Sequence, residues 1–287
     1  MGNISVVSQK DGTLVWADPQ DWSTAVRRFL RDRLPDNIRS AIEAGPEMYF
    51  YTDDTKWEGD RLVRCRDNQE IPGLRDLLQE FQQTYSKVIM FHGCRTEDVG
   101  SYLRDGFLPL DVDKQMQKAR DLFLTDRYPQ ITEGQFSAAA SECNDVYRQQ
   151  GIFFSLDETV LINWSGHYLV YGSEYLQCVA AELTRATGVE CEETLRNIGV
   201  PTMFVCDVPL SLIQRDRMWH LLVELIRLEP YAAGEERPSI DFTFKFAGPI
   251  PADVIRSHYH PTCIWDQSDS KMYRHNDSFC PFCNRNP

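Results

Sequence analysis

The stretch formed by residues 87–95 constrains the fold more than any other part of the sequence. An uninterrupted apolar run at 88–91 leads directly into His92-Gly93. A short apolar run that ends at a glycine predicts a buried β-strand with an exposed end. Because glycine lets a ligand or another backbone approach closely, a histidine beside it can face a bound molecule. The alternative interpretation is an ordinary strand-to-helix turn in which this histidine has no function.

Strand and helix signals are both present along the rest of the chain, and the fold class that we predict is α+β. Further strands are expected at 13–16, 48–51, 151–155, 201–208 and 240–246, and helices at 22–30, 74–85, 96–106, 112–124, 135–150, about 161–187 and 215–228. Thr96 is a good N-cap for the helix at 96–106, and Gly106 is a good stop signal. The N–H groups at the start of that helix would lie beside His92, where they suit an anionic ligand group.

The charge balance argues against a nucleic-acid partner. The chain of 287 residues has 30 Lys and Arg against 43 Asp and Glu, a net charge of −13, and it contains no run of basic residues. Non-specific phosphate binding requires Lys and Arg that displace counterions. We therefore expect a small-molecule or protein partner.

No targeting or membrane signal is visible in the sequence. No apolar stretch approaches the ~20 residues that a membrane span requires, and residues 1–15 lack the basic start and apolar centre of a signal peptide. Nine cysteines without a secretory signal indicate a reducing compartment, so a cytoplasmic location is predicted. The six cysteines at 65, 94, 143, 178, 191 and 206 are expected to be scattered thiols.

The predicted helix at 161–187 carries a polar row beside its apolar stripe. The row has steps of four, three, four and four residues and consists of His167, Tyr171, Glu174, Cys178 and Glu182. The alternative is an ordinary solvated helix face. However, Gly172 in a helix costs about 1 kcal/mol relative to Ala, and a glycine in such a place often admits another group.

The order of these segments over about residues 85–256 resembles the His-Tyr-Glu class of ADP-ribosyltransferases, which includes diphtheria-toxin-like enzymes and poly-ADP-ribose polymerases. The resemblance rests on the strand that ends in His92-Gly93, the strand Gly-Ile-Phe-Phe-Ser at 151–155, and the Gly-Pro-Ile-Pro-Ala-Asp-Val-Ile segment at 248–255. It implies a split β-sheet core with surrounding helices. In that family the His contacts the NAD ribose, the Tyr stacks on nicotinamide, and the Glu steadies an oxocarbenium-like transition state.

The resemblance implies a role for particular residues of this chain. His92 would contact the ribose, and Phe153 and Phe154 stand where the family often has a Tyr. The stacking aromatic would then be Tyr171, Trp164 or Tyr168. Further NAD contacts would come from Gly93, Arg95, Phe154 and Ser155.

The catalytic carboxylate has several candidates. The strand that should begin at the family's Glu has Asp241, and Glu235 and Glu236 precede it in a loop. A carboxylate that is misplaced by about one methylene can cost ~100-fold in rate. Glu174, Glu236 and Asp241 therefore all stay candidates.

The implied activity is transfer of ADP-ribose from NAD, its substrate, to a macromolecular target, as in a toxin or a defence effector. The acidic net charge favours a protein acceptor over a nucleic acid. Two alternatives remain: a non-enzymatic, zinc-containing protein-interaction module, and a zinc-dependent hydrolase built on the tail. The predicted segments are a structural or partner-facing subdomain at 1–84, a NAD-binding transferase domain at 85–256, and a zinc-binding tail at 257–287.

The tail contains two pairs of candidate metal ligands with the same spacing. His260 and Cys263 are separated by two residues, and so are Cys280 and Cys283. Thiolate and imidazole ligands in a closed set of four are typical of structural Zn²⁺. His258 and His275 are alternative ligands, and free cysteines in a loose tail are the alternative without a metal. A catalytic zinc would need an open coordination position and an acid beside it, which Asp266 or Asp269 could supply.

Overall fold

The computed structural model describes residues 12–26, 74–147, 151–228, 243–275, 280, 282 and 283. The chain forms two compact units, and each is described by itself. The first unit contains Met1–Met90 and Cys206–Phe244, and the second contains Phe91–Val205 and Lys245–Pro287. The strand predicted at 48–51 and the second part of the helix predicted at 22–30, from residue 27 onward, lie outside the described residues.

The mixed α+β class predicted from the sequence is confirmed. A six-stranded sheet has the order β5-β3-β2-β4-β6, with β1 also paired to β2. The strands are β1 (Thr13–Leu14), β2 (Lys87–Thr96), β3 (Ile152–Ser155), β4 (Val200–Pro209), β5 (Thr243–Phe246) and β6 (Ile255–Tyr259). β2 and β3 are antiparallel with Phe91 opposite Ser155, whereas β1 and β2 are parallel. Four consecutive buried side chains in β2, at 88–91, explain why this run forms an inner strand.

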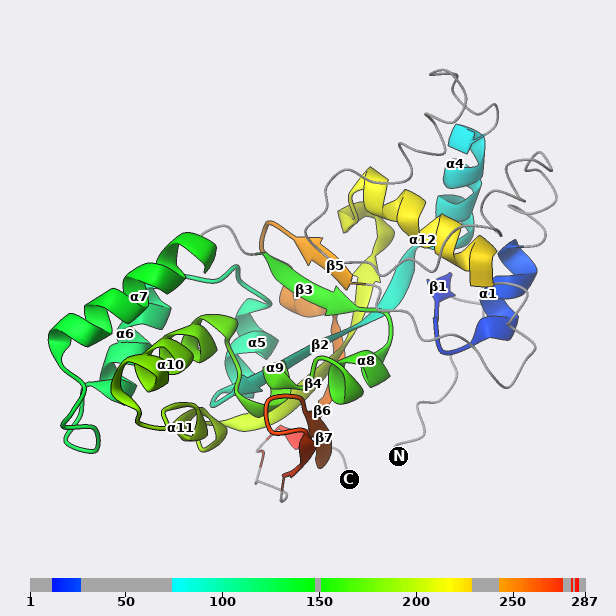
Figure 1. Cartoon of the computed structure of the whole chain (residues 1–287). Helices are drawn as coiled ribbons and strands as arrows, with labels where there is room; N and C mark the ends of the chain where they lie inside the picture. Colours follow the sequence, from blue (N-terminus) through cyan, green and yellow to red (C-terminus); the bar gives the residue numbers. More distant parts are fainter. Residues whose placement is uncertain are drawn as a thin grey trace. The chain divides into compact units, whose positions relative to one another are not determined.

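In the first unit, helices pack through apolar faces. The described part of this unit contains α1 (Pro19–Ala25), α4 (Leu74–Thr84), the 3₁₀ turn η4 (Leu210–Leu212) and α12 (Arg215–Leu228). α4 contacts α12, as Figure 1 shows. Trp16 and Trp22 stack with their ring centroids 5.4 Å apart, and the Trp22 indole donates to the Trp16 carbonyl oxygen. An ion pair of 3.1 Å between Lys87 and Asp207 joins β2 to β4.

The second unit contains a group of helices whose members contact one another and, through α8, strand β3. This group consists of α5 (Val99–Asp105), α6 (Val112–Phe123), α7 (Glu133–Tyr147), α8 (Glu158–Asn163), α9 (His167–Val170), α10 (Glu174–Thr187) and α11 (Glu192–Arg196). α10 contacts α6, α7 and α11 (Figure 1). Its buried face includes Tyr175, Val179 and Leu183, all fully buried. Burial of each such side chain contributes about 1.5–3 kcal/mol, so this face anchors α10.

The prediction of one continuous helix at 161–187 is wrong. The chain forms α8, α9 and α10 instead: α8 ends at the non-helical Trp164, and α9 is separated from α10 because Gly172 has a φ of 90° and Ser173 is extended. A φ of this sign ends a right-handed helix, and glycine adopts it without a steric penalty. The predicted polar row is therefore divided, and its members at 171 and 174 belong to different segments.

The C-terminal part of the second unit ends in a small hairpin. After the 3₁₀ turn η6 (Ala252–Val254), β7 (Cys263–Asp266) pairs in antiparallel fashion with β8 (Lys271–Arg274). β7 contacts α8 and α9. A side chain at Gly166 would collide with the carbonyl oxygen of Trp265, so glycine is required for this approach. Among the described residues, no helix has the length and apolar character to cross a membrane.

Candidate ligand pocket and metal centre

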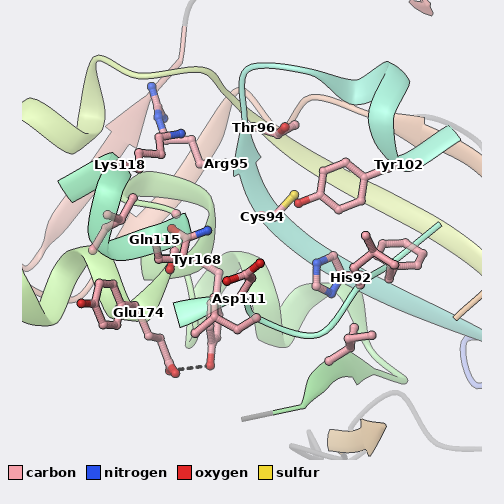
Figure 2. Close-up of a pocket in the computed structure, with 18 of the residues that line it drawn as sticks. His92, Cys94, Arg95, Thr96, Tyr102, Asp111, Gln115, Lys118, Tyr168 and Glu174 are labelled. Atoms are coloured by element: carbon pink, nitrogen blue, oxygen red, sulfur yellow. Dashed lines mark hydrogen bonds between the residues drawn. The ribbon is translucent and has the colours of Figure 1, made fainter. Parts of the chain in front are cut away.

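A cavity of about 650 Å³ lies beside the end of β2 in the second unit (Figure 2). Its wall comes from β2, α5, α6, the start of β3 and the segment that joins α9 to α10. The predicted site residues that line it are His92, Gly93, Arg95, Tyr168, Tyr171 and Glu174. The fold thus brings His92 into one cavity with the tyrosines and the glutamate of a segment distant in the sequence.

His92 is held as a neutral hydrogen-bond acceptor. Its Nδ1 lies 2.8 Å from the carbonyl oxygen of Phe153, which can only accept, so Nδ1 carries the proton and Nε2 the lone pair. Burial lowers the pKa of His92 to about 4. The ring packs edge-on against Phe107, with centroids 4.8 Å apart, and lies 5.4 Å from the ring of Phe154. A neutral Nε2 suits a ligand hydroxyl, which donates a hydrogen bond.

Tyr168 and Glu174 form a polar pair at the cavity wall. The Tyr168 hydroxyl donates to Glu174 Oε1 over 2.6 Å, the bond drawn as a dashed line in Figure 2. The Nε2 atom of His167 lies 3.6 Å from the same oxygen. Glu174 is also the first residue of α10, where the helix dipole favours a carboxylate. This carboxylate is therefore oriented and can stabilise positive charge in a ligand.

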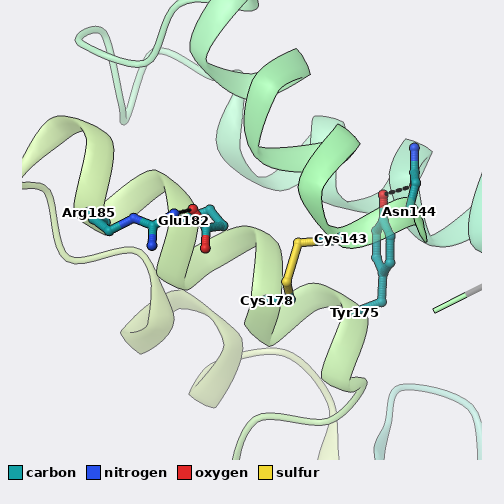
Figure 3. The surroundings of a disulfide bond; sticks show 6 residues. All are labelled: Cys143, Asn144, Tyr175, Cys178, Glu182 and Arg185. Atoms are coloured by element: carbon teal, nitrogen blue, oxygen red, sulfur yellow. Dashed lines mark hydrogen bonds and ion pairs between the residues drawn. A yellow bond between two sulfur atoms is a disulfide. The ribbon is translucent and has the colours of Figure 1, made fainter. Parts of the chain in front are cut away.

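A disulfide secures the helix that carries Glu174. Cys143 of α7 is bonded to Cys178 of α10, and one turn earlier the Tyr175 hydroxyl donates to Asn144 Oδ1 over 2.9 Å (Figure 3). The expectation that Cys143 and Cys178 are thiols is wrong. The two residues meet because the apolar faces of α7 and α10 pack together.

The hydroxyl of Tyr171 is held by the C-terminal hairpin. It lies 3.2 and 3.0 Å from the two carboxylate oxygens of Asp266, a fully buried side chain. Arg196 binds the same hydroxyl, bonds Asp266 over 2.8 Å and pairs with Asp269, and its guanidinium lies 4.9 Å from the centre of the Tyr171 ring. Burial raises the pKa of Tyr171 to about 12. Tyr171 therefore offers the cavity its ring, and its hydroxyl is engaged elsewhere.

Arg95 shapes the wall through backbone contacts. Its guanidinium donates to the carbonyl oxygens of Ile198 over 2.8 Å and Leu169 over 3.4 Å, and to the Tyr273 hydroxyl over 3.3 Å. These bonds occupy the head group of Arg95. Arg95 nevertheless lines the cavity, so its direct contact with NAD stays a prediction.

Other predicted contacts lie away from the cavity. Phe154 and Ser155 are buried at 1% and 2% exposure, and the Ser155 hydroxyl donates to the Asp157 carbonyl oxygen. Trp164 is 62% exposed and is not among the lining residues. These positions follow from the pleat of β3, in which Phe153 faces the cavity and Phe154 the core. The candidates Glu235, Glu236 and Asp241 lie outside the described residues.

Sequence reasoning missed several lining residues. Figure 2 shows Tyr102 of α5, the α6 N-cap Asp111, and Gln115 and Lys118 of α6 around the cavity. The spacing of the last three, at i, i+4 and i+7, places them on one helix face and was the available signal. The thiol of Cys94 also lines the cavity, and burial raises its pKa to about 12, so it is not a nucleophile near neutral pH.

Four side chains of the tail could hold a metal ion. The ligand atoms of His258, His260, Cys280 and Cys283 all lie within 4.8 Å of one another, and His258 Nε2 is 3.1 Å from the Cys283 sulfur. Cys263 and His275 are not in this group, so the predicted ligand Cys263 is replaced by His258. The reason is the strand period of two, which places 258 and 260 on one face, whereas Cys263 begins β7 opposite Arg274.

The chemistry of this group fits a metal. His260 Nδ1 lies 2.8 Å from the carbonyl oxygen of Pro201, and its buried Nε2 has no hydrogen-bond partner. Metal-binding histidines commonly donate their second ring N–H to a carbonyl in this way. Burial lowers the pKa of His258, which favours the neutral form that binds metals. The His258 ring also lies 6.0 Å from that of Phe204, which positions it.

Comparison with known proteins gives no assignment. No protein-family model matches the chain, and searches of curated proteins and of solved structures find no significant match.

Proposed function

We propose that the second unit is an ADP-ribosyltransferase that binds NAD in the cavity at the end of β2 and transfers ADP-ribose to a macromolecule. The observation that carries the proposal is the meeting of His92, Tyr171 and Glu174 in one cavity. A hydrogen-bond acceptor, an aromatic ring and a carboxylate are the groups that a ribosyl transfer requires. The antiparallel pairing of β2 with β3 also supports an ADP-ribosyltransferase-like core.

In this proposal each residue has a distinct task. The Nε2 atom of His92 accepts a hydrogen bond from a ribose hydroxyl, and the Tyr171 ring provides a flat surface for nicotinamide. The glycosidic C–N bond breaks, its electron pair leaves with nicotinamide, and positive charge develops on the ribose. Glu174 stabilises this charge, which oriented polar groups do best where water is excluded. An acceptor nucleophile then forms the new bond to the ribose carbon and loses its proton to solvent.

The test is NAD binding and nicotinamide release by the full chain. We expect wild type to bind NAD by calorimetry and to release labelled nicotinamide, and His92→Ala and Glu174→Gln to lose most of the release. Removal of one oriented polar group typically costs ~10²–10³-fold in rate. Trp164→Ala, which changes an exposed aromatic residue outside the cavity, is the matched control and should behave like wild type. A wild-type chain that neither binds nor consumes NAD ends the proposal.

We further propose that the tail group binds Zn²⁺ and that this zinc is structural. Two histidines and two cysteines form a closed set of four ligands, which leaves no position for a reacting water. When bound, zinc would supply order to a segment with few aliphatic side chains. A chain that binds zinc but not NAD would instead favour the alternative function, a zinc-containing protein-interaction module.

The zinc proposal is tested by metal analysis and thermal stability. We expect about one zinc per chain and a fall in melting temperature on chelation. Cys283→Ser should lose the metal, while Cys263→Ser, a cysteine outside the group, should keep it. Unchanged stability after chelation, or loss of zinc in Cys263→Ser alone, would contradict the ligand set.

A further inference from the structure

We propose that the turn that carries the metal ligands Cys280 and Cys283 acts as a clamp on helix α5. Phe282, which lies in this turn, transmits the effect of metal binding to the cavity wall. The inference rests on the proposed zinc site, and it does not require the cavity ligand to be NAD. It assigns to the zinc a second effect besides local order. Zinc binding and ligand binding would then be coupled, each favouring the other.

The contact that carries the inference lies between Phe282 and Gly100. A Cβ atom added at Gly100 would lie 2.6 Å from Cζ and 3.1 Å from Cε2 of the Phe282 ring. The ring tip therefore fills the space that a side chain on α5 would occupy. Gly100 is the second residue of α5, in the first turn of the helix. Packing explains the glycine at position 100, because a side chain there would overlap the Phe282 ring.

The position of Phe282 depends on the metal ligands. Cys280 and Cys283 flank it in the sequence, and both sulfurs lie next to His258 Nε2, at 3.6 and 3.1 Å. A metal bound by both cysteines fixes this turn at two points, one on each side of Phe282. The ring between them is then held against α5. Without the metal, only the weaker contacts of the two sulfurs with His258 Nε2 would hold this turn.

α5 in turn forms part of the cavity wall. Asp98, Ser101 and Tyr102, which surround Gly100 in the sequence, all line the cavity. The Tyr102 ring lies 6.4 Å from the ring of His92 and 4.8 Å from that of Phe204 (Figure 2). A shift of α5 would therefore move the aromatic group that packs beside His92. Phe282 is a positioning residue in this scheme, because it acts on the cavity through α5.

The test compares amide hydrogen exchange of residues 99–105 with and without Zn²⁺ in the full chain. In wild type, zinc removal should speed exchange of these amides roughly tenfold, within the usual range of coupling between sites. In Phe282→Ala, zinc should still bind with the same stoichiometry, but exchange of these amides should be fast and independent of the metal. Phe282→Leu, which keeps an apolar side chain, should restore part of the protection.

Gly100→Ala provides a second, independent arm. Its methyl group would displace the ring tip, so zinc affinity measured by chelator competition should fall several-fold in the wild-type background. In the Phe282→Ala background the same change should leave zinc affinity unaffected, because the overlap is gone. If wild type binds zinc but the amides of α5 exchange at the same rate with and without the metal, the clamp alone is overturned. A chain that binds no zinc overturns both the clamp and the metal site, whereas failure to bind NAD overturns only the enzymatic proposal.

Discussion

The disulfide between Cys143 and Cys178 leads to a prediction whose size can be worked out. The two residues are 35 positions apart, so the bond closes a loop that contains α8 and α9. In the chain-entropy model the fixed term contributes about 0.6 kcal/mol and the logarithm of loop length about 3.2 kcal/mol at 25 °C, roughly 4 kcal/mol together. For a unit of this size the change corresponds to a fall in melting temperature of roughly 8–16 °C.

The assay is urea unfolding of wild type and of Cys143→Ala/Cys178→Ala, each with and without a thiol reductant. We expect the reductant to destabilise wild type by about the amount above and to leave the double variant unchanged. Cys191→Ala removes a buried cysteine that is free, and it should keep the sensitivity to reductant. Equal free energies of unfolding for oxidised wild type and the double variant, or quantitative labelling of Cys143 in the native protein, would refute the reasoning.

Two further predictions concern the cavity wall. The pKa of His92 is about 4 in the folded chain and near 6.5 in the unfolded chain, so between these values the unfolded state binds more protons and stability falls as the pH falls. The expected loss in the free energy of unfolding is about 3 kcal/mol. It is measured as the difference in pH dependence of this free energy between wild type and His92→Gln, and parallel curves for the two proteins would contradict it. Gly172→Ala forces alanine to a φ of 90° and should destabilise by about 1–2 kcal/mol, whereas Gly134→Ala, with open space at the start of α7, should be neutral or stabilising by urea unfolding.

Much of the sheet could be predicted because its strands have a strong local signal. The apolar runs at 88–91 and 201–208 both became inner strands, although β2 continues beyond its apolar run and through Gly93 to Thr96. The break at Gly172 could not be read in the same way. Apolar residues keep a helical spacing on both sides of it, in α9 and α10, and spacing does not report the sign of φ.

The metal group and the disulfide show where sequence spacing fails. The spacing of Cys280 and Cys283 identified one pair of metal ligands. The second predicted pair, His260 and Cys263, assumed that both ligands lie in one turn. Strand geometry selected His258 instead. The disulfide depends on which helices pack together, and no spacing of cysteines contains that information. Because disulfides are typical of oxidising compartments, the cytoplasmic location stays a prediction that thiol analysis of the native protein should test.

The partnership of Asp266 with Arg196 and Tyr171 has a practical consequence for anyone who shortens this protein. A chain cut after residue 256 would lose the metal group, and it would also remove the buried Asp266 carboxylate from beside the Arg196 guanidinium and the Tyr171 phenol. Such a fragment would have a damaged cavity wall from the outset. An inactive fragment of this kind would therefore say nothing about whether the metal takes part in the chemistry.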